Sequence, residues 1–130
     1  MRTRRIFILT SHTLLARGVE SLLQSQRGLR VVGIETDPQQ GIPRIRSLQP
    51  DVVITGSELG GPPSLAVVSA MFEASPGTTV IGLCAGDNLL HVYRDNQIKV
   101  ARLEDLIQAI RQAGVSKSPR SEKATEADRR

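Results

Sequence analysis

The sequence contains few of the residues on which many functions depend. It has one cysteine, no tryptophan and three aromatic residues, Phe7, Phe72 and Tyr93. A single cysteine excludes an intramolecular disulfide and a cysteine-rich metal site. Three aromatic residues are too few to form a stacking platform for single-stranded nucleic acid. No apolar run approaches the roughly 18 residues of a membrane-spanning helix, so we expect a soluble cytoplasmic protein with no membrane partner.

Charge of one sign is not concentrated either. The formal net charge is +4, and half of it comes from residues 116–130, which hold five basic and three acidic groups. The rest of the chain is too weakly basic for a DNA-binding face, so we predict no direct binding to nucleic acid. The glycines lack the spacing of phosphate-binding and dinucleotide-binding loops, and His12 and His91 are isolated from other metal-ligating residues. We therefore expect no metal and no cofactor.

Short β-rich runs alternate with helical patterns along most of the chain. The strand pattern occurs at residues 6–9, 29–35, 50–55 and 78–83, and apolar residues at helical spacing occur at residues 12–26, 38–48, 64–74 and 102–113. Strands rich in Val and Ile that each lead into a crossover helix form a mostly parallel sheet covered on both faces. The sequence therefore predicts a doubly wound α/β domain.

The segment between Cys84 and Lys99 breaks this rhythm. Two β-prone runs, 89–93 and 97–100, flank the polar turn signal at residues 94–96. The pattern favours a β-hairpin, and the alternative is a short helix over 87–93 followed by one strand, because short apolar runs are ambiguous. We predict one domain over residues 1–115. Residues 116–130 lack apolar anchors, as is typical of a disordered tail or linker, and are too few for a helix-turn-helix output domain.

Residues 4–113 resemble the receiver domain of bacterial response regulators, particularly receivers attached to LuxR-type DNA-binding regulators. The resemblance rests on the following residues: Thr10-Ser11-His12 with Leu14, Arg17, Gly18, Leu22 and Leu23; Val31-Val32-Gly33; Pro50-Asp51-Val52-Val53-Ile54; Gly60-Gly61; Lys99-Val100-Ala101; and Glu104-Asp105-Leu106. It implies a CheY-like three-layer sandwich with five parallel strands in the order 2-1-3-4-5 and a functional edge at their carboxyl ends. The fourth helix of the family is lost here, or replaced by a hairpin around residues 89–100.

The resemblance also implies where phosphorylation chemistry would lie. A phosphorylatable receiver has an acidic pair after its first strand, an aspartate ending its third, a hydroxyl residue ending its fourth and a lysine ending its fifth. In this sequence these positions fall on Thr10 and Ser11, Gly56, Cys84 and Lys99, so only the lysine is kept. Because Mg²⁺ binding and phosphoryl transfer depend on carboxylates, the pattern predicts a pseudo-receiver without catalytic residues.

We therefore expect a non-enzymatic module that serves signal transduction or transcription control through phosphorylation-independent contacts with a protein partner or with itself. A small-ligand sensor that uses the same sheet edge is the alternative. Loss of the fourth helix leaves apolar side chains short of cover, and such side chains usually mark an interface. We expect a homodimer formed by the last helix with segment 89–100, or by the first helix. The interface candidates in that segment are Leu89, Leu90, Val92, Tyr93 and Ile98.

Overall fold

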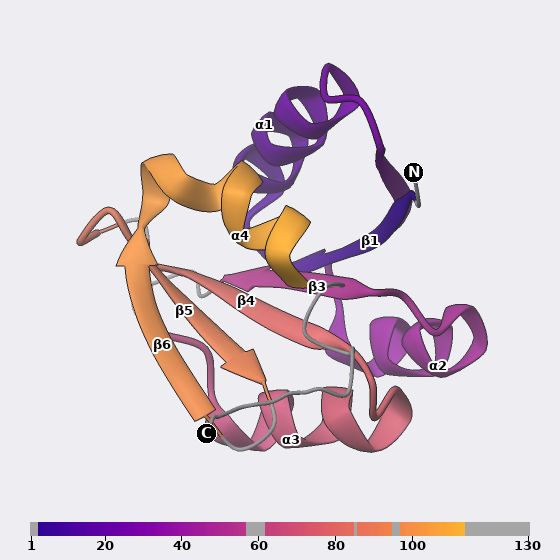
Figure 1. Cartoon of the computed structure of the whole chain (residues 1–130). Coiled ribbons are helices and arrows are strands. Elements are labelled where there is room, and N and C mark those ends of the chain that lie inside the picture. The colour runs from indigo at the N-terminus through magenta and orange to yellow at the C-terminus, as the bar shows by residue number, and fades with distance from the viewer. Residues whose placement is uncertain (1–2, 57–61, 85, 95–96, 114–130) are drawn as a thin grey trace, which may run out of the picture.

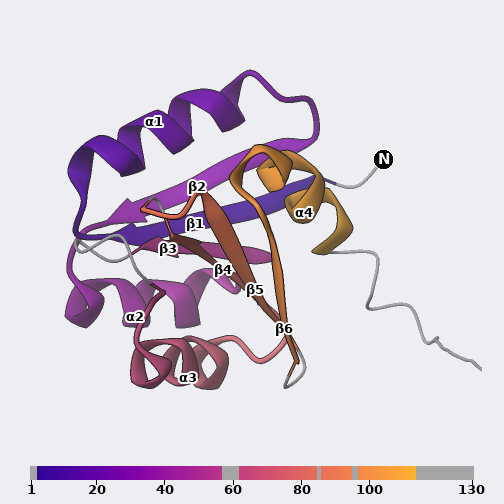
Figure 2. The same ribbon diagram turned by 90° about the vertical axis from the view of Figure 1, so that its left-hand side faces the viewer.

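The computed structural model describes residues 3–56, 62–84, 86–94 and 97–113, which form three layers (Figure 1). A six-stranded sheet with the strand order β2-β1-β3-β4-β5-β6 lies in the middle. Helices α1 and α4 cover one face of this sheet, and α2 and α3 cover the other (Figure 2). This arrangement confirms the predicted doubly wound α/β class. The predicted domain boundary at residue 115 and the tail 116–130 lie outside the described residues.

The first four strands are parallel and are connected by three helices. The strands are β1 (Arg4–Thr10), β2 (Leu29–Glu35), β3 (Val52–Gly56) and β4 (Thr79–Cys84), and the helices are α1 (Thr13–Gln24), α2 (Pro38–Leu48) and α3 (Leu65–Ala74). Then come β5 (Leu89–Arg94), β6 (Gln97–Arg102), the 3₁₀ turn η1 (Leu103–Asp105) and α4 (Leu106–Ala113). No helix in these ranges is long and apolar enough to cross a membrane.

Three polar side chains start the crossover helices at the carboxyl edge of the sheet. His12, Asp37 and Ser64 accept hydrogen bonds from the backbone N–H groups of Leu15 (3.1 Å), Gln39 (3.0 Å) and Ala66 (3.2 Å). Each bond satisfies an N–H group that has no partner within its helix, which contributes about 1 kcal/mol. The caps therefore hold the first turns of α1, α2 and α3 beside the ends of the preceding strands.

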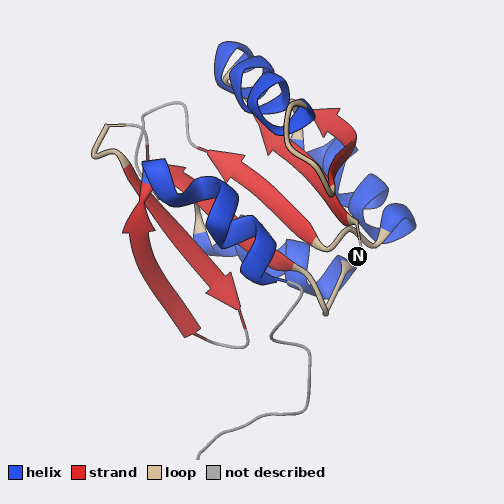
Figure 3. Ribbon diagram, turned by 45° about the horizontal axis from the view of Figure 1, so that its top comes forward, coloured by secondary structure: helices blue, strands red, loops and turns tan. Residues whose placement is uncertain are grey.

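The sheet has six strands rather than the five that we expected. β5 runs antiparallel to β4, and β6 pairs antiparallel with β5 from Leu89↔Arg102 to Arg94↔Gln97 (Figure 3). The hairpin interpretation is thus confirmed and the short-helix alternative is wrong, although the turn residues 95 and 96 lie outside the described residues. A crossover helix would have delivered one parallel strand next to β4, whereas the hairpin inserts β5 between β4 and β6.

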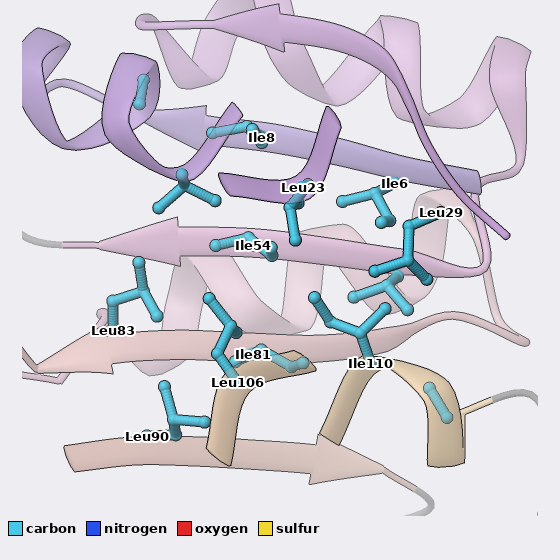
Figure 4. Packing of buried hydrophobic residues seen from close by; sticks show 14 residues of the cluster. Ile6, Ile8, Leu23, Leu29, Ile54, Ile81, Leu83, Leu90, Leu106 and Ile110 are labelled. Carbon is cyan, nitrogen blue, oxygen red and sulfur yellow. The ribbon is translucent and has the colours of Figure 1, made fainter. Parts of the chain in front are cut away.

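Two buried clusters hold the layers together. On the α1 and α4 face, Leu23, Leu106 and Ile110 pack against sheet residues such as Ile54 and Ile81 (Figure 4). On the opposite face, residues of α2 and α3 pack against Phe7, Leu9 and Val53. Burying each large aliphatic side chain contributes about 1.5–3 kcal/mol. Both faces of the central strands are thus fully used by the core, and chemistry is confined to the strand ends and to the hairpin.

Candidate functional site

A crevice of about 350 Å³ opens at the carboxyl edge of the sheet, where β1 and β3 end and α2 and α3 begin. Open α/β sheets characteristically bind ligands at this edge. Five of its lining residues carry a hydroxyl group, and none of its described lining residues is charged. The lining consists of Leu9, Thr10, Ser11, Thr36, Pro38, Thr55, Gly56, Pro63, Ser64 and Val67.

Three of the predicted site positions meet in this crevice. The Thr10 hydroxyl donates a hydrogen bond to the carbonyl oxygen of Gly56 (3.3 Å) and accepts one from the backbone N–H of His12 (3.1 Å). Thr10 is 4% exposed, whereas Ser11 beside it is exposed. The Thr10 side chain therefore joins the ends of β1 and β3 and is already engaged within the fold.

Gly56 ends β3 at the position where the family resemblance places the phosphoacceptor. A Cβ atom on Gly56 would lie 3.1 Å from Cδ2 of Leu15 and 3.5 Å from the hydroxyl oxygen of Thr10. The first of these distances is tighter than ordinary van der Waals contact, so the end of the Leu15 side chain in the first turn of α1 would have to shift by a few tenths of an ångström to admit a side chain here. The position therefore lacks the carboxylate and is tightly packed against α1.

The oxygen groups of the crevice do not fit Mg²⁺. Magnesium prefers octahedral coordination by hard oxygen ligands, usually with one or two carboxylates. The crevice offers neutral hydroxyls instead, and both the Thr10 hydroxyl and the Gly56 carbonyl already take part in a hydrogen bond. The nearby Asp37 carboxylate caps α2 through Gln39. In the described residues, no group of three or more His, Cys, Asp or Glu is placed to hold a metal ion.

Cys84 and Lys99 are not among the crevice residues. Cys84 ends β4 with 1% of its surface exposed, and burial, followed by the charge of Asp87, raises the pKa of its thiol above the usual 9.0. Lys99 lies in the middle of β6, opposite Val92, which in turn lies opposite Ile81 in β4. Lys99 is therefore separated from β3 by three strand spacings of about 4.8 Å each. Because β5 lies between β4 and β6, this lysine is remote from the crevice.

The two histidines contact residues of their own segments and lie outside the crevice lining. Nδ1 of His12 accepts the capping hydrogen bond of α1 from the backbone N–H of Leu15. His91 lies on β5 with its ring centroid 6.3 Å from that of Tyr93. Neither residue lines the crevice.

The interface candidates divide into buried and accessible residues. Leu90 and Tyr93 are buried in the chain's own core, and Leu89 and Val92 are partly buried. Ile98 is 57% exposed, and Val100, two residues along the same strand, is 59% exposed. A groove of about 540 Å³ separates Ile98 from α3, where Leu65 is 67% exposed and Phe72 partly buried. We call Leu65, Phe72, Ile98 and Val100 the α3–hairpin patch.

Sequence reasoning missed several residues that shape the crevice. Thr55 is 5% exposed and lines it. A polar residue ending the apolar run 52–54 was the available signal. Pro63 lies so close to β4 that a Cβ atom on Gly82 would come within 2.6 Å of its ring. Only the tertiary structure brings Pro63 and Leu15 to this edge.

The chain is similar to response regulators both in sequence and in structure. No family model matches the chain. The response regulator GacA of Pseudomonas viridiflava is 27% identical over 114 residues, covering 82% of this chain and 53% of GacA. A protein-glutamate methylesterase/protein-glutamine glutaminase of Geobacter sulfurreducens is 26% identical over 81 residues, covering 62% of this chain and 22% of that protein. The chain thus spans about half the length of the GacA proteins that it matches.

Solved structures show the same fold. The response regulator RcsB in complex with DNA superposes with a TM-score of 0.57 at 17% identity, covering 98% of this chain and 54% of RcsB. The response regulator domain of Thermotoga maritima CheB gives 0.54 at 21% identity, covering 62% and 60%. The chain is thus similar in sequence to response regulators and shares the fold of their receiver domains.

Proposed function

We propose that the chain is a pseudo-receiver: a cytoplasmic, non-enzymatic module that transmits a signal or controls transcription through phosphorylation-independent contacts with a protein partner or a second copy of itself. The observation that carries this proposal is the uncharged lining of the crevice, in which Gly56 stands at the phosphoacceptor position of the family resemblance. Gly56 offers no nucleophile to a phosphorus atom, and Thr10 and Ser11 offer no anionic ligand to a metal.

The experiment incubates the protein with a small phosphodonor and Mg²⁺ and measures its intact mass. The mass should stay unchanged while a phosphorylatable receiver, treated in parallel, gains one phosphoryl group. A phosphoryl gain on an acid-labile site of this chain would overturn the pseudo-receiver proposal. Without phosphorylation, a change between two conformations of this domain has to be driven by a partner, a ligand or a second copy that binds one conformation more tightly than the other.

The α3–hairpin patch supports the interaction part of the proposal. Three of its four residues expose more than half of a large apolar side chain, on the sheet face that α3 only partly covers. Contiguous exposed apolar side chains are characteristic of protein-binding surfaces. Self-association in a symmetric dimer is the simplest use of such a patch, because one surface then serves both partners.

A small-ligand sensor is the second candidate, and the composition of the crevice is the observation that favours it. Five residues with hydroxyl groups line a crevice of about 350 Å³. That volume lies within the range of small-molecule sites. A thermal-shift screen with nucleotides and metabolites tests this candidate, because a ligand at 100 times its Kd stabilises the folded chain by about 2.7 kcal/mol. No shift from any compound would leave the partner-binding function as the proposal.

A further inference from the structure

A second, smaller pocket of about 170 Å³ lies between the β5–β6 hairpin and α4. It lies on the α4 side of the hairpin and shares no residue with the crevice, whereas Arg94 and Gln97 also border the groove beside α3 and Val100 of the α3–hairpin patch borders this pocket. Arg94, Gln97 and Lys99 line it from the hairpin, and Gln112 lines it from α4. Arg94 pairs with Gln97, and Lys99 follows two residues later on the same face of β6.

Two positive charges border this pocket without a negative partner among the described residues. Within these residues, the side chains of Arg94 and Lys99 form no ion pair and no hydrogen bond. Glu104 and Asp105 lie in η1, at the opposite end of α4 from the pocket residues Gln112 and Ala113. Like charges at diagonal positions of an antiparallel pair repel each other. An anion between them would relieve this repulsion.

A buried hydroxyl group adds an independent observation. Thr79 also lines the pocket and is 1% exposed, and its hydroxyl oxygen has no hydrogen-bond partner among the described residues. A buried polar group without a partner is uncommon in native structures and calls for an explanation. Two unpaired cations, two amides and this hydroxyl are the groups that recognise oxyanions.

We propose that this pocket binds a small oxyanion, either a phosphate or a carboxylate group. Its volume corresponds to about six water molecules and falls below the range of sites for nucleotides or drug-sized ligands. Arg94 supplies a planar guanidinium and Lys99 a compact ammonium, and both donate to anionic oxygens. The proposal goes beyond partner docking and gives Lys99 a role remote from the crevice.

The test is an NMR titration of the full chain with inorganic phosphate and, separately, with acetate, against sodium chloride at matched ionic strength. We expect phosphate, acetate or both to shift the backbone amides of residues 97–101 and the side-chain amides of Gln97 and Gln112. Shifts with phosphate alone identify a phosphate site, and shifts with acetate identify a carboxylate site. Shifts that sodium chloride reproduces, or none at these residues, would overturn the proposal.

Two pairs of variants separate a built site from general attraction by positive charge. Lys99→Gln should weaken binding about tenfold, the effect of losing one charge-assisted hydrogen bond, whereas Arg17→Gln on the exposed face of α1 should leave binding unchanged. Thr79→Val should also weaken binding. Thr78→Val is its control and should leave binding unchanged, because Thr78 likewise has a buried hydroxyl without a partner in the described residues but does not line this pocket. Equal effects of Lys99→Gln and Arg17→Gln would contradict the assignment.

Discussion

Position 56 shows how one residue and its neighbour decide the chemistry of the crevice. In a phosphorylatable receiver a carboxylate would stand here, whereas Gly56 has no side chain and Cδ2 of Leu15 lies 3.1 Å from the place of a Cβ atom. The position therefore differs from such a receiver in charge, and the packing of Leu15 leaves little room for a side chain. Restoring one carboxylate does not restore the missing pair at Thr10 and Ser11.

We accordingly predict that Gly56→Asp does not make the chain accept a phosphoryl group. The new side chain displaces Leu15 and brings a carboxylate into a partly apolar site, so the free energy of unfolding should fall by about 1–3 kcal/mol. Intact mass after treatment with a phosphodonor and Mg²⁺, together with urea denaturation, measures both effects. Gly18→Asp is the control, because nothing lies within 4 Å of a Cβ atom there. A phosphoryl gain in Gly56→Asp alone would contradict this prediction.

Thr78 offers a second prediction at the residue scale. It is 2% exposed, and its hydroxyl oxygen has no hydrogen-bond partner among the described residues. Burying an unpaired hydroxyl costs free energy that a methyl group of similar shape does not. Thr78→Val should therefore raise the free energy of unfolding by about 1 kcal/mol in urea denaturation, whereas Thr36→Val, at an exposed position, should change it little. A loss of stability in Thr78→Val would mean that the hydroxyl is satisfied in solution.

At the scale of elements, the junction of β4 and β5 makes stability depend on alkaline pH. Burial raises the pKa of the Cys84 thiol above its usual 9.0, and the charge of Asp87 raises it further. Burial also raises the pKa of the Tyr93 hydroxyl above its usual 10.0, and the charge of Cys84 adds to this shift. Both groups are neutral when protonated. The folded chain therefore keeps these two protons to higher pH than the unfolded chain does.

We predict that the stabilisation from these two groups is complete below about pH 9 and is lost as the pH rises through their raised values. Urea midpoints between pH 7 and pH 11 measure the decline. Cys84→Ala should remove the part that begins near pH 9 and leave the later part, which belongs to Tyr93. A thiol reagent should react with Cys84 slowly at pH 7, because the side chain is 1% exposed. An unchanged alkaline decline in Cys84→Ala would contradict the role of the thiol.

At the scale of the whole molecule, the hairpin determines which surface is available to a partner. It covers one sheet edge with β5 and β6 and leaves the α3–hairpin patch open. Lys99 in the exposed edge strand discourages continuous pairing of β6 with a second sheet, because charged residues on an edge oppose such pairing. We therefore expect association through side chains of the patch rather than through the backbone of β6.

The corresponding prediction is a dimer of the 14.1 kDa chain in sedimentation experiments at tens of micromolar. Replacing both Ile98 and Val100 with Ser should return the protein to a monomer, because it removes two exposed apolar side chains without touching the core. Leu14→Ser, at a residue of α1 that is 78% exposed, is the matched control. Dissociation by Leu14→Ser instead would place the interface on the first helix, and a wild-type monomer would contradict self-association.

The sequence by itself determined the class of fold and the approximate position of its elements. The apolar run within 50–55 is typical of a buried strand, and β2 and α2 have the predicted bounds, whereas the helix predicted over 102–113 begins at Leu106 after the 3₁₀ turn. The lack of carboxylates at Thr10, Ser11 and Gly56 could also be read directly once the family resemblance had assigned these positions. These features depend on residue type and near neighbours, which a sequence displays.

Only the tertiary structure decided which distant residues meet. Leu15 packs beside Gly56, Pro63 lies against Gly82, and β5 separates Lys99 from β4, all through contacts between elements far apart in sequence. The pairing of Arg94 with Gln97, and the position of Thr79 beside them, likewise depend on strand register and on where α4 packs. Strand register and helix packing follow from the shape of the whole core, so they cannot be derived from the local pattern of apolar and polar residues.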